Sequence, residues 1–108
     1  MDNLYKLEDG KISKTTDVYE WAESINKTRN LKQSYVENKL ISTVFLGMEY
    51  GYLYDKPILF ETMVFDIDGE DIDMDRYTTL EDAIKGHEKM VEKYSPNHIK
   101  LEDDLFEI

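Results

Sequence analysis

Six carboxylates stand within ten residues of this chain, in the stretch DIDGEDIDMD (residues 66–75), with no basic side chain among them. Such a cluster could hold a cation, supply acid–base groups, or present a negative surface to a partner. An EF-hand calcium loop needs oxygen ligands at positions 1, 3, 5, 9 and 12 around a glycine at position 6. With Gly69 at position 6, Val64 and Ile72 would occupy two of the ligand positions. The sequence therefore predicts neither a metal site nor a bound cofactor.

The dipeptide Asp68-Gly69 is typical of a two-residue hairpin turn. A turn there predicts three cross-strand pairs on one apolar face: Phe65 with Ile72, Met63 with Met74, and Glu61 with Arg76. Because strand side chains alternate, the other face would carry a row of aspartates: Asp66, Asp71, Asp73 and Asp75. Asp66 opposite Asp71 would destabilise a hairpin, so stability alone does not explain the placement. The predicted partner-binding carboxylates are Asp66, Asp68, Glu70, Asp71, Asp73 and Asp75.

A turn-rich segment, GYLYDKP, precedes this hairpin and adds candidate contacts. Its tyrosines, with the one just before it, are Tyr50, Tyr52 and Tyr54. They make the segment amphipathic, so it could line an interface or a pocket, while packing in the core is the plainer use of such residues.

One histidine lies at a helical position where it could do chemistry. Thr79 is typical of a helix N-cap, and the helix that follows predicts an inward stripe of Leu80, Ala83, Ile84, His87, Val91 and Tyr94. A buried Glu61 near His87 could form an acid–base pair, or a ligand pocket together with Arg76. The plainer reading is that Arg76 holds Glu61 and His87 makes a backbone hydrogen bond. No phosphate loop, catalytic triad or metal-ligand spacing is present, so the sequence predicts no catalytic residue and no enzyme.

The remaining elements position these residues. A short hairpin is predicted about Asp9-Gly10, and a helix is predicted from Asp17 with an apolar stripe of Val18, Trp21, Ala22 and Ile25. Two strands should meet at Asn38-Lys39, and the second, Leu40 to Leu46, should be covered on both faces. The sequence thus predicts an α+β fold: an antiparallel sheet of about four to five strands with two helices on one face. A chain of 108 residues is expected to form a single domain, 1–108, with an acidic C-terminal tail at residues 95–108.

Charge excludes several classes of partner. The net charge is −11, and residues 41–108 carry all of it, with 17 acidic and 6 basic side chains. Direct binding to nucleic acid or to an anionic membrane surface is not expected, because both need a basic face. A basic protein would be attracted. With no cysteine and no apolar run of about 20 residues, a cytoplasmic location is expected. The oligomeric state is left open, a homodimer included.

Several blocks of the chain resemble a family of small uncharacterised proteins recurrent in bacteriophage and prophage genomes. The blocks are STVFLG, PILFETMVF and RYTTLEDAIKGHEKMV, with EWA upstream, and the resemblance covers most of residues 4–94. The chain departs from the pattern at Glu49-Tyr50, where members tend to have Asp-His. The resemblance carries over as family-typical residues Trp21, Ser42, Thr43, Glu61, Thr62, Arg76, Tyr77, Ala83, Gly86 and His87.

The resemblance implies a phage origin and a place in the bacterial host cell. By analogy with small acidic phage proteins, it points to an inhibitor of host machinery, such as a CRISPR nuclease or another defence protein. The leading expectation is therefore an anti-defence binding protein that occupies a basic surface of a nucleic-acid-binding host protein. The alternative is a small-ligand binder or sponge with a pocket near Glu61, Arg76 and His87.

Overall fold

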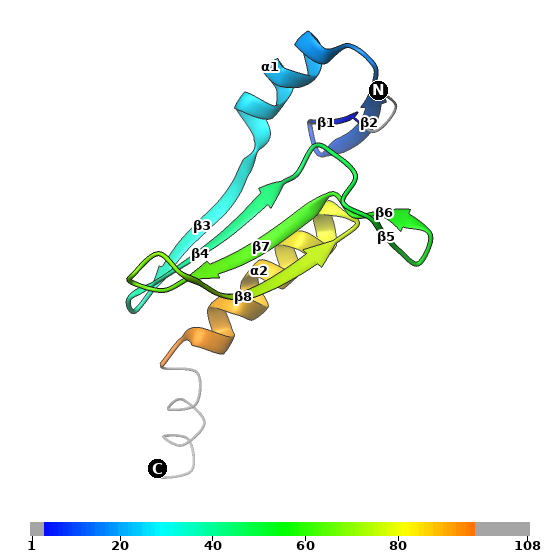
Figure 1. Cartoon of the computed structure of the whole chain (residues 1–108). Helices are drawn as coiled ribbons and strands as arrows, with labels where there is room; N and C mark the ends of the chain where they lie inside the picture. The colour runs from blue at the N-terminus through cyan, green and yellow to red at the C-terminus, as the bar shows by residue number, and fades with distance from the viewer. Residues whose placement is uncertain (1–3, 97–108) are drawn as a thin grey trace.

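The computed structural model describes residues 4–96 of the chain. In these residues two strands precede the first helix and six strands separate it from the second, an α+β arrangement (Figure 1). The elements are β1 (Leu4–Glu8), β2 (Lys11–Thr15), α1 (Val18–Thr28), β3 (Asn30–Val36), β4 (Lys39–Phe45), β5 (Tyr52–Leu53), β6 (Lys56–Pro57), β7 (Phe60–Phe65), β8 (Asp71–Tyr77) and α2 (Leu80–Tyr94). The predicted α+β class is confirmed. Most of the predicted acidic tail, from residue 97 onward, lies outside the described residues.

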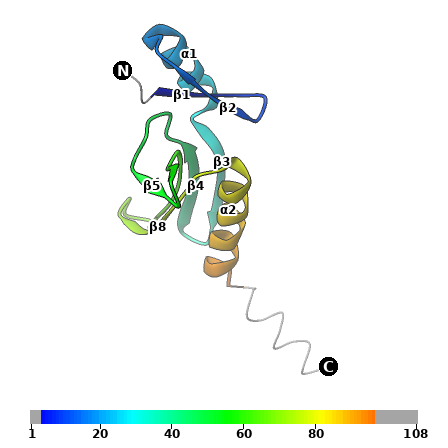
Figure 2. The ribbon, with the colours of Figure 1, turned by 90° about the vertical axis from the view of Figure 1, so that its right-hand side faces the viewer.

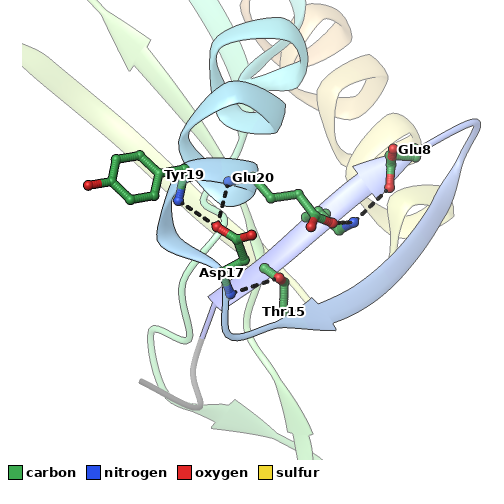
Figure 3. Close-up of polar contacts among 6 residues, drawn as sticks. Glu8, Thr15, Asp17, Tyr19 and Glu20 are labelled. Atoms are coloured by element: carbon green, nitrogen blue, oxygen red, sulfur yellow. Dashed lines mark hydrogen bonds and ion pairs between the residues drawn. The ribbon is translucent and has the colours of Figure 1, made fainter.

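The N-terminal part is a hairpin followed by a capped helix. β1 and β2 pair about Asp9-Gly10 as predicted. Asp17 caps α1 by accepting the backbone N–H groups of Tyr19 and Glu20 (Figure 3). The Glu20 side chain pairs with Lys6 of β1. This contact ties α1 to the hairpin.

A four-stranded antiparallel sheet in the order β3-β4-β7-β8 forms the centre of the molecule. Val36 pairs with Lys39, so the turn between β3 and β4 is at Glu37-Asn38, one residue earlier than predicted. In the sequence, β5 and β6 lie between β4 and β7 and form a separate small hairpin. The two edges of the central sheet are therefore β3 and β8.

Only one face of the central sheet is covered by a helix in the described part of the chain. α2 lies along this face (Figure 2), and the β5–β6 hairpin extends past the end of the sheet (Figure 1), where Leu53 and Tyr54 border a hollow together with residues of α2. Under α2 the side chains of Ile41, Phe45, Phe60 and Val64 are fully buried, with the rings of Phe45 and Phe60 5.3 Å apart. We call the other face the open face. β4 is thus interior to the sheet but covered on one side, contrary to the prediction of two covered faces.

The other helix, α1, packs chiefly against β1 rather than on the central sheet. Its apolar stripe is narrower than the sequence suggests, because Val18 and Ala22 are exposed and only Trp21 and Ile25 turn inward. Both of these side chains lie close to Gly47, whose carbonyl accepts a hydrogen bond from the Trp21 indole N–H. This glycine has a positive φ of 72°, which a side chain rarely adopts.

Helix α2 begins after Thr79, whose hydroxyl accepts the Asp82 N–H as the sequence predicts. Gly86 faces the sheet so closely that an added Cβ would lie 2.1 Å from the Tyr77 hydroxyl, which explains a glycine inside a helix. The predicted inward stripe is wrong at Ile84, which is exposed. Met90 takes the buried place instead. The helix rests on its small residues, Ala83 and Gly86, and so approaches the strands tightly.

Candidate interaction site

The turn between β7 and β8 carries most of the free negative charge of the sequence-predicted site. We call residues 66–71 the acidic turn. Its backbone is closed by hydrogen bonds from Asp66 N–H to the Glu70 carbonyl and from Gly69 N–H to the Asp66 carbonyl, each 2.8 Å long. Asp68, Glu70 and Asp71 are exposed, and no side chain within residues 4–96 pairs with them. They are available to a partner.

The predicted row of aspartates on one face is only partly formed. Met63 pairs with Met74 and Glu61 with Arg76 as predicted, but the register shifts after Val64 and sets Phe65 opposite Asp71. A β-bulge of this kind breaks the alternation that the prediction assumed. Asp71 does not face Asp66, and the predicted Phe65–Ile72 pair is wrong.

Three of the predicted partner-binding aspartates already accept hydrogen bonds within the fold. Asp66 Oδ1 accepts the Ile67 N–H over 2.7 Å. Asp73 points toward α2, where Lys93 and the Tyr94 hydroxyl each lie 2.7 Å from its Oδ2. The hydrogen bond from Lys93 is the main reason that the pKa of Asp73 is lowered, and that from Tyr94 adds to it. Asp75 is exposed, and its Oδ1 accepts the backbone N–H of the next residue, Arg76.

The predicted tyrosines lie at and around the β5–β6 hairpin. We call residues 50–57 the tyrosine hairpin. Tyr50, Tyr52 and Tyr54 are all at least half exposed, and Tyr54 is 95% exposed. Tyr54 and Asp55 occupy the turn with φ values of 52° and 64°, a backbone conformation that is unfavourable for a bulky residue such as tyrosine. A large aromatic ring presented at this turn is therefore not explained by packing.

Tyr50 joins the tyrosine hairpin to the open face. Its ring lies 5.7 Å from the guanidinium carbon of Arg76, within cation–π range. Arg76 Nε in turn donates to Glu61 Oε2 over 3.0 Å, which confirms the predicted ion pair. The open face continues from these three residues through Met63, Met74 and Val44, which are half-buried or exposed.

His87 lies on the opposite face from Glu61 and Arg76, so the three residues of the alternative ligand pocket do not come together. Alternation along β7 places Phe60, Thr62 and Val64 against α2, and Glu61 therefore points away from the helix. Burying a threonine whose hydroxyl is hydrogen-bonded costs less than burying an ion pair. This difference explains why the face with Glu61 is the open one.

His87 belongs instead to a buried chain of hydrogen bonds that crosses the sheet. Its Nε2 lies 2.8 Å from the Ser34 hydroxyl and its Nδ1 2.7 Å from that of Thr43. Thr43 is 2.5 Å from the Thr62 hydroxyl, which accepts from Tyr77 over 3.1 Å. With the His87 proton on Nε2, each buried donor in this network has an acceptor, and the Ser34 hydroxyl that accepts from Nε2 is only half-buried. The imidazole is fully buried, so we assign a structural role to this chain of hydrogen bonds.

This environment predicts a dependence of stability on pH. Burial lowers the pKa of His87, and the positive charge of Lys32 lowers it further. In the unfolded chain the group titrates near 6.5. Below that pH the unfolded state binds a proton that the folded state does not, so stability should fall as the pH drops through about 6.5.

Thermal unfolding at about pH 7.5 and pH 5.5 checks this expectation. The wild-type midpoint should be lower at the acidic pH. His87→Gln should be less stable at both values but should lose that part of the pH dependence. Equal pH dependence in the two proteins would contradict the assignment. Asp73, whose pKa is lowered, stabilises the fold equally at both pH values. Its stabilising effect is lost only when the pH falls below the ordinary range of a carboxyl group.

Two surface hollows were missed by sequence reasoning, and both are lined by charged residues. One, of about 350 Å³, lies between β1 and α1 and is bordered by Lys6, Glu20 and Lys27. The other, of about 290 Å³, lies beside the tyrosine hairpin and is bordered by Tyr54, Arg76 and Lys89. Small-molecule sites are usually lined mainly by apolar side chains, and these hollows are at the small end of the size range of such sites. Neither includes His87 or Glu61.

Within residues 4–96 no group of three or more His, Cys, Asp or Glu side chains is arranged to hold a metal ion. The helices of this part of the chain are too short or too polar to cross a bilayer.

The buried hydrogen-bond chain could have been sought in the sequence. Thr43 and Thr62 each stand between apolar residues two positions away on both sides, Ile41 and Phe45 or Phe60 and Val64. A histidine stands on the helix expected to cover them. Comparison with known proteins adds no further assignment: no family model, no curated protein and no solved structure matches the chain.

Proposed function

We propose that this chain is a binding protein without catalytic activity that docks on a basic surface of another protein. The observation that carries the proposal is the placement of the contact residues along the open face. The tyrosine hairpin lies at one end of the sheet, where Tyr50 contacts Arg76 on the open face, and the acidic turn lies at the other end (Figure 1). Aromatic side chains and an arginine are the residue types that most often dominate binding energy.

The charge distribution supports a basic partner. Residues 41–108 carry the entire net charge of −11, and the free carboxylates Asp68, Glu70 and Asp71 stand at the tip of a hairpin. Charge of this kind accelerates association with a positive surface and weakens with added salt. A nucleic-acid-binding protein offers such a surface in its binding groove.

The resemblance to phage and prophage proteins narrows the proposal. In a bacterial host, a basic groove that a phage gains from blocking belongs to a defence nuclease or a related nucleic-acid-binding protein. The proposed role is therefore anti-defence inhibition by occupation of that groove. This narrower step rests on analogy.

A capture experiment tests the proposal. The immobilised chain should retain a basic, nucleic-acid-binding protein from host lysate at about 0.05 M salt and release it at about 0.5 M. A matched column carrying the chain with Asp68→Asn, Glu70→Gln and Asp71→Asn should retain much less. Capture that survives high salt, or that the triple variant retains in full, would contradict docking by charge. Copurification of a small molecule with no protein would favour the ligand-binding alternative.

A further inference from the structure

The two edge strands of the central sheet, β3 and β8, differ in whether their outward backbone N–H groups already have hydrogen-bond acceptors. An edge strand exposes backbone N–H and C=O groups that can pair with another strand. In an antiparallel ladder, alternate residues direct these groups toward the neighbour and away from it. Leu46 N–H bonds to the Leu59 carbonyl, which fixes this alternation across β4, β7 and β8.

On β8 the outward N–H groups belong to Met74 and Arg76. Each is already accepted by the carboxylate of the preceding aspartate: Asp73 Oδ1 at 2.8 Å and Asp75 Oδ1 at 2.9 Å. The repeated Asp-X pattern thus occupies the donors of this edge and lines it with negative charge. The β8 edge is closed to strand pairing.

On β3 the outward groups are open. Phe45 N–H bonds to the Arg29 carbonyl, so the outward residues of the regular stretch of β3 are Gln33 and Tyr35. Within residues 4–96 their backbone N–H groups have no hydrogen-bond partner, and the Tyr35 side chain is 80% exposed. The strand carries a single charged residue, Lys32. Its regular stretch, residues 32–36, is nearly neutral and has a free edge, which favours strand addition.

We propose that two copies of this chain pair through β3 as antiparallel strands about a twofold axis near Ser34. The regular stretch of residues 32–36 is centred on Ser34, and the register shift lies outside it, toward Asn30. In this arrangement Gln33 of each copy meets Tyr35 of the other, and Lys32 meets Val36. No like charges stand directly opposite one another.

The charge map argues for a second copy as the occupant. Residues 1–40 hold 7 basic and 7 acidic side chains and are neutral, whereas the remainder carries −11. Two copies therefore repel least when they approach through β3. The contact leaves β8, with the acidic turn, at the far edge of each sheet. The dimer would thus present two copies of the proposed binding site.

A charge-exchange experiment tests the pairing. The Gln33 side chains of the two copies lie on the same face as diagonal neighbours, roughly 7–8 Å apart. Gln33→Glu alone and Gln33→Lys alone should each be mainly monomeric in sedimentation or light scattering at roughly 100 µM, with a mass near 12.8 kDa. The wild type, and an equal mixture of the two variants, should have about twice that mass.

Ser13→Glu, on the exposed strand β2, adds the same charge away from the edge and should leave the dimer intact. Circular dichroism checks that each variant folds, and Gln33→Pro, which removes the outward N–H, should give the same monomer. A wild-type monomer overturns the proposal. So does a dimer that both Gln33 charge variants retain, because the copies would then meet elsewhere.

Discussion

Replacing His87 with alanine is expected to destabilise the fold by about 3–5 kcal/mol. The imidazole is fully buried, and its loss leaves a cavity under α2 and removes the partners of Ser34 and Thr43. The loss should appear as a lower midpoint in denaturant-induced unfolding. The exposed neighbour Glu88 provides the control, because Glu88→Ala should change the free energy of unfolding by less than about 0.5 kcal/mol.

A second, milder substitution tests the same hydrogen bonds if His87→Ala does not fold. Thr43→Val keeps the shape of the side chain and removes the hydroxyl that joins His87 to Thr62. It should cost about 1–3 kcal/mol. If His87→Ala kept the stability of the wild type and lost partner binding, His87 would belong to a binding site and the structural assignment would be wrong.

Replacing Tyr54 with asparagine is expected to weaken partner binding by about 2 kcal/mol or more, which is roughly 30-fold in Kd. Asparagine tolerates the positive φ of 52° better than tyrosine, so the turn should be kept while the ring is removed. The free energy of unfolding should be unchanged or higher. Titration calorimetry against the captured partner measures the loss.

The carboxylates of the acidic turn should act mainly on the association rate. The triple variant Asp68→Asn, Glu70→Gln and Asp71→Asn lowers the magnitude of the net charge from −11 to −8. A matched control removes three charges from the helices instead: Glu23→Gln, Glu81→Gln and Glu88→Gln. Both proteins have the same net charge. Only the turn variant should show slower association and a weaker dependence on salt, and equal effects would mean that net charge alone matters.

Much of the fold could be predicted because local patterns and tertiary packing agree. Asp9-Gly10 and Asp68-Gly69 fall in or beside hairpin turns, and Asp17 and Thr79 cap the helices. Each of these signals depends on a few neighbouring residues.

The site was harder to predict, since it depends on which face of β7 turns inward. Both faces of FETMVF contain large apolar residues, and the difference lies in Thr62 against Glu61. The hydroxyl of Thr62 finds partners on β4 and β8, a long-range fact that alternation alone does not contain. The bulge after Val64 was also unpredictable from the Asp68-Gly69 turn. These two features separated His87 from Glu61 and divided the row of aspartates.

Hydrogen exchange of the chain, alone and bound to its captured partner, tests the central claim most directly. New protection is expected at the amides of residues 51–55 and 66–72, at the tips of the two hairpins at the ends of the open face. The amides of the β1–β2 hairpin and α1 should exchange at the same rate in both states. Protection confined to β1 and α1, around the hollow bordered by Lys6 and Lys27, with both tips unchanged, would contradict the proposed binding site.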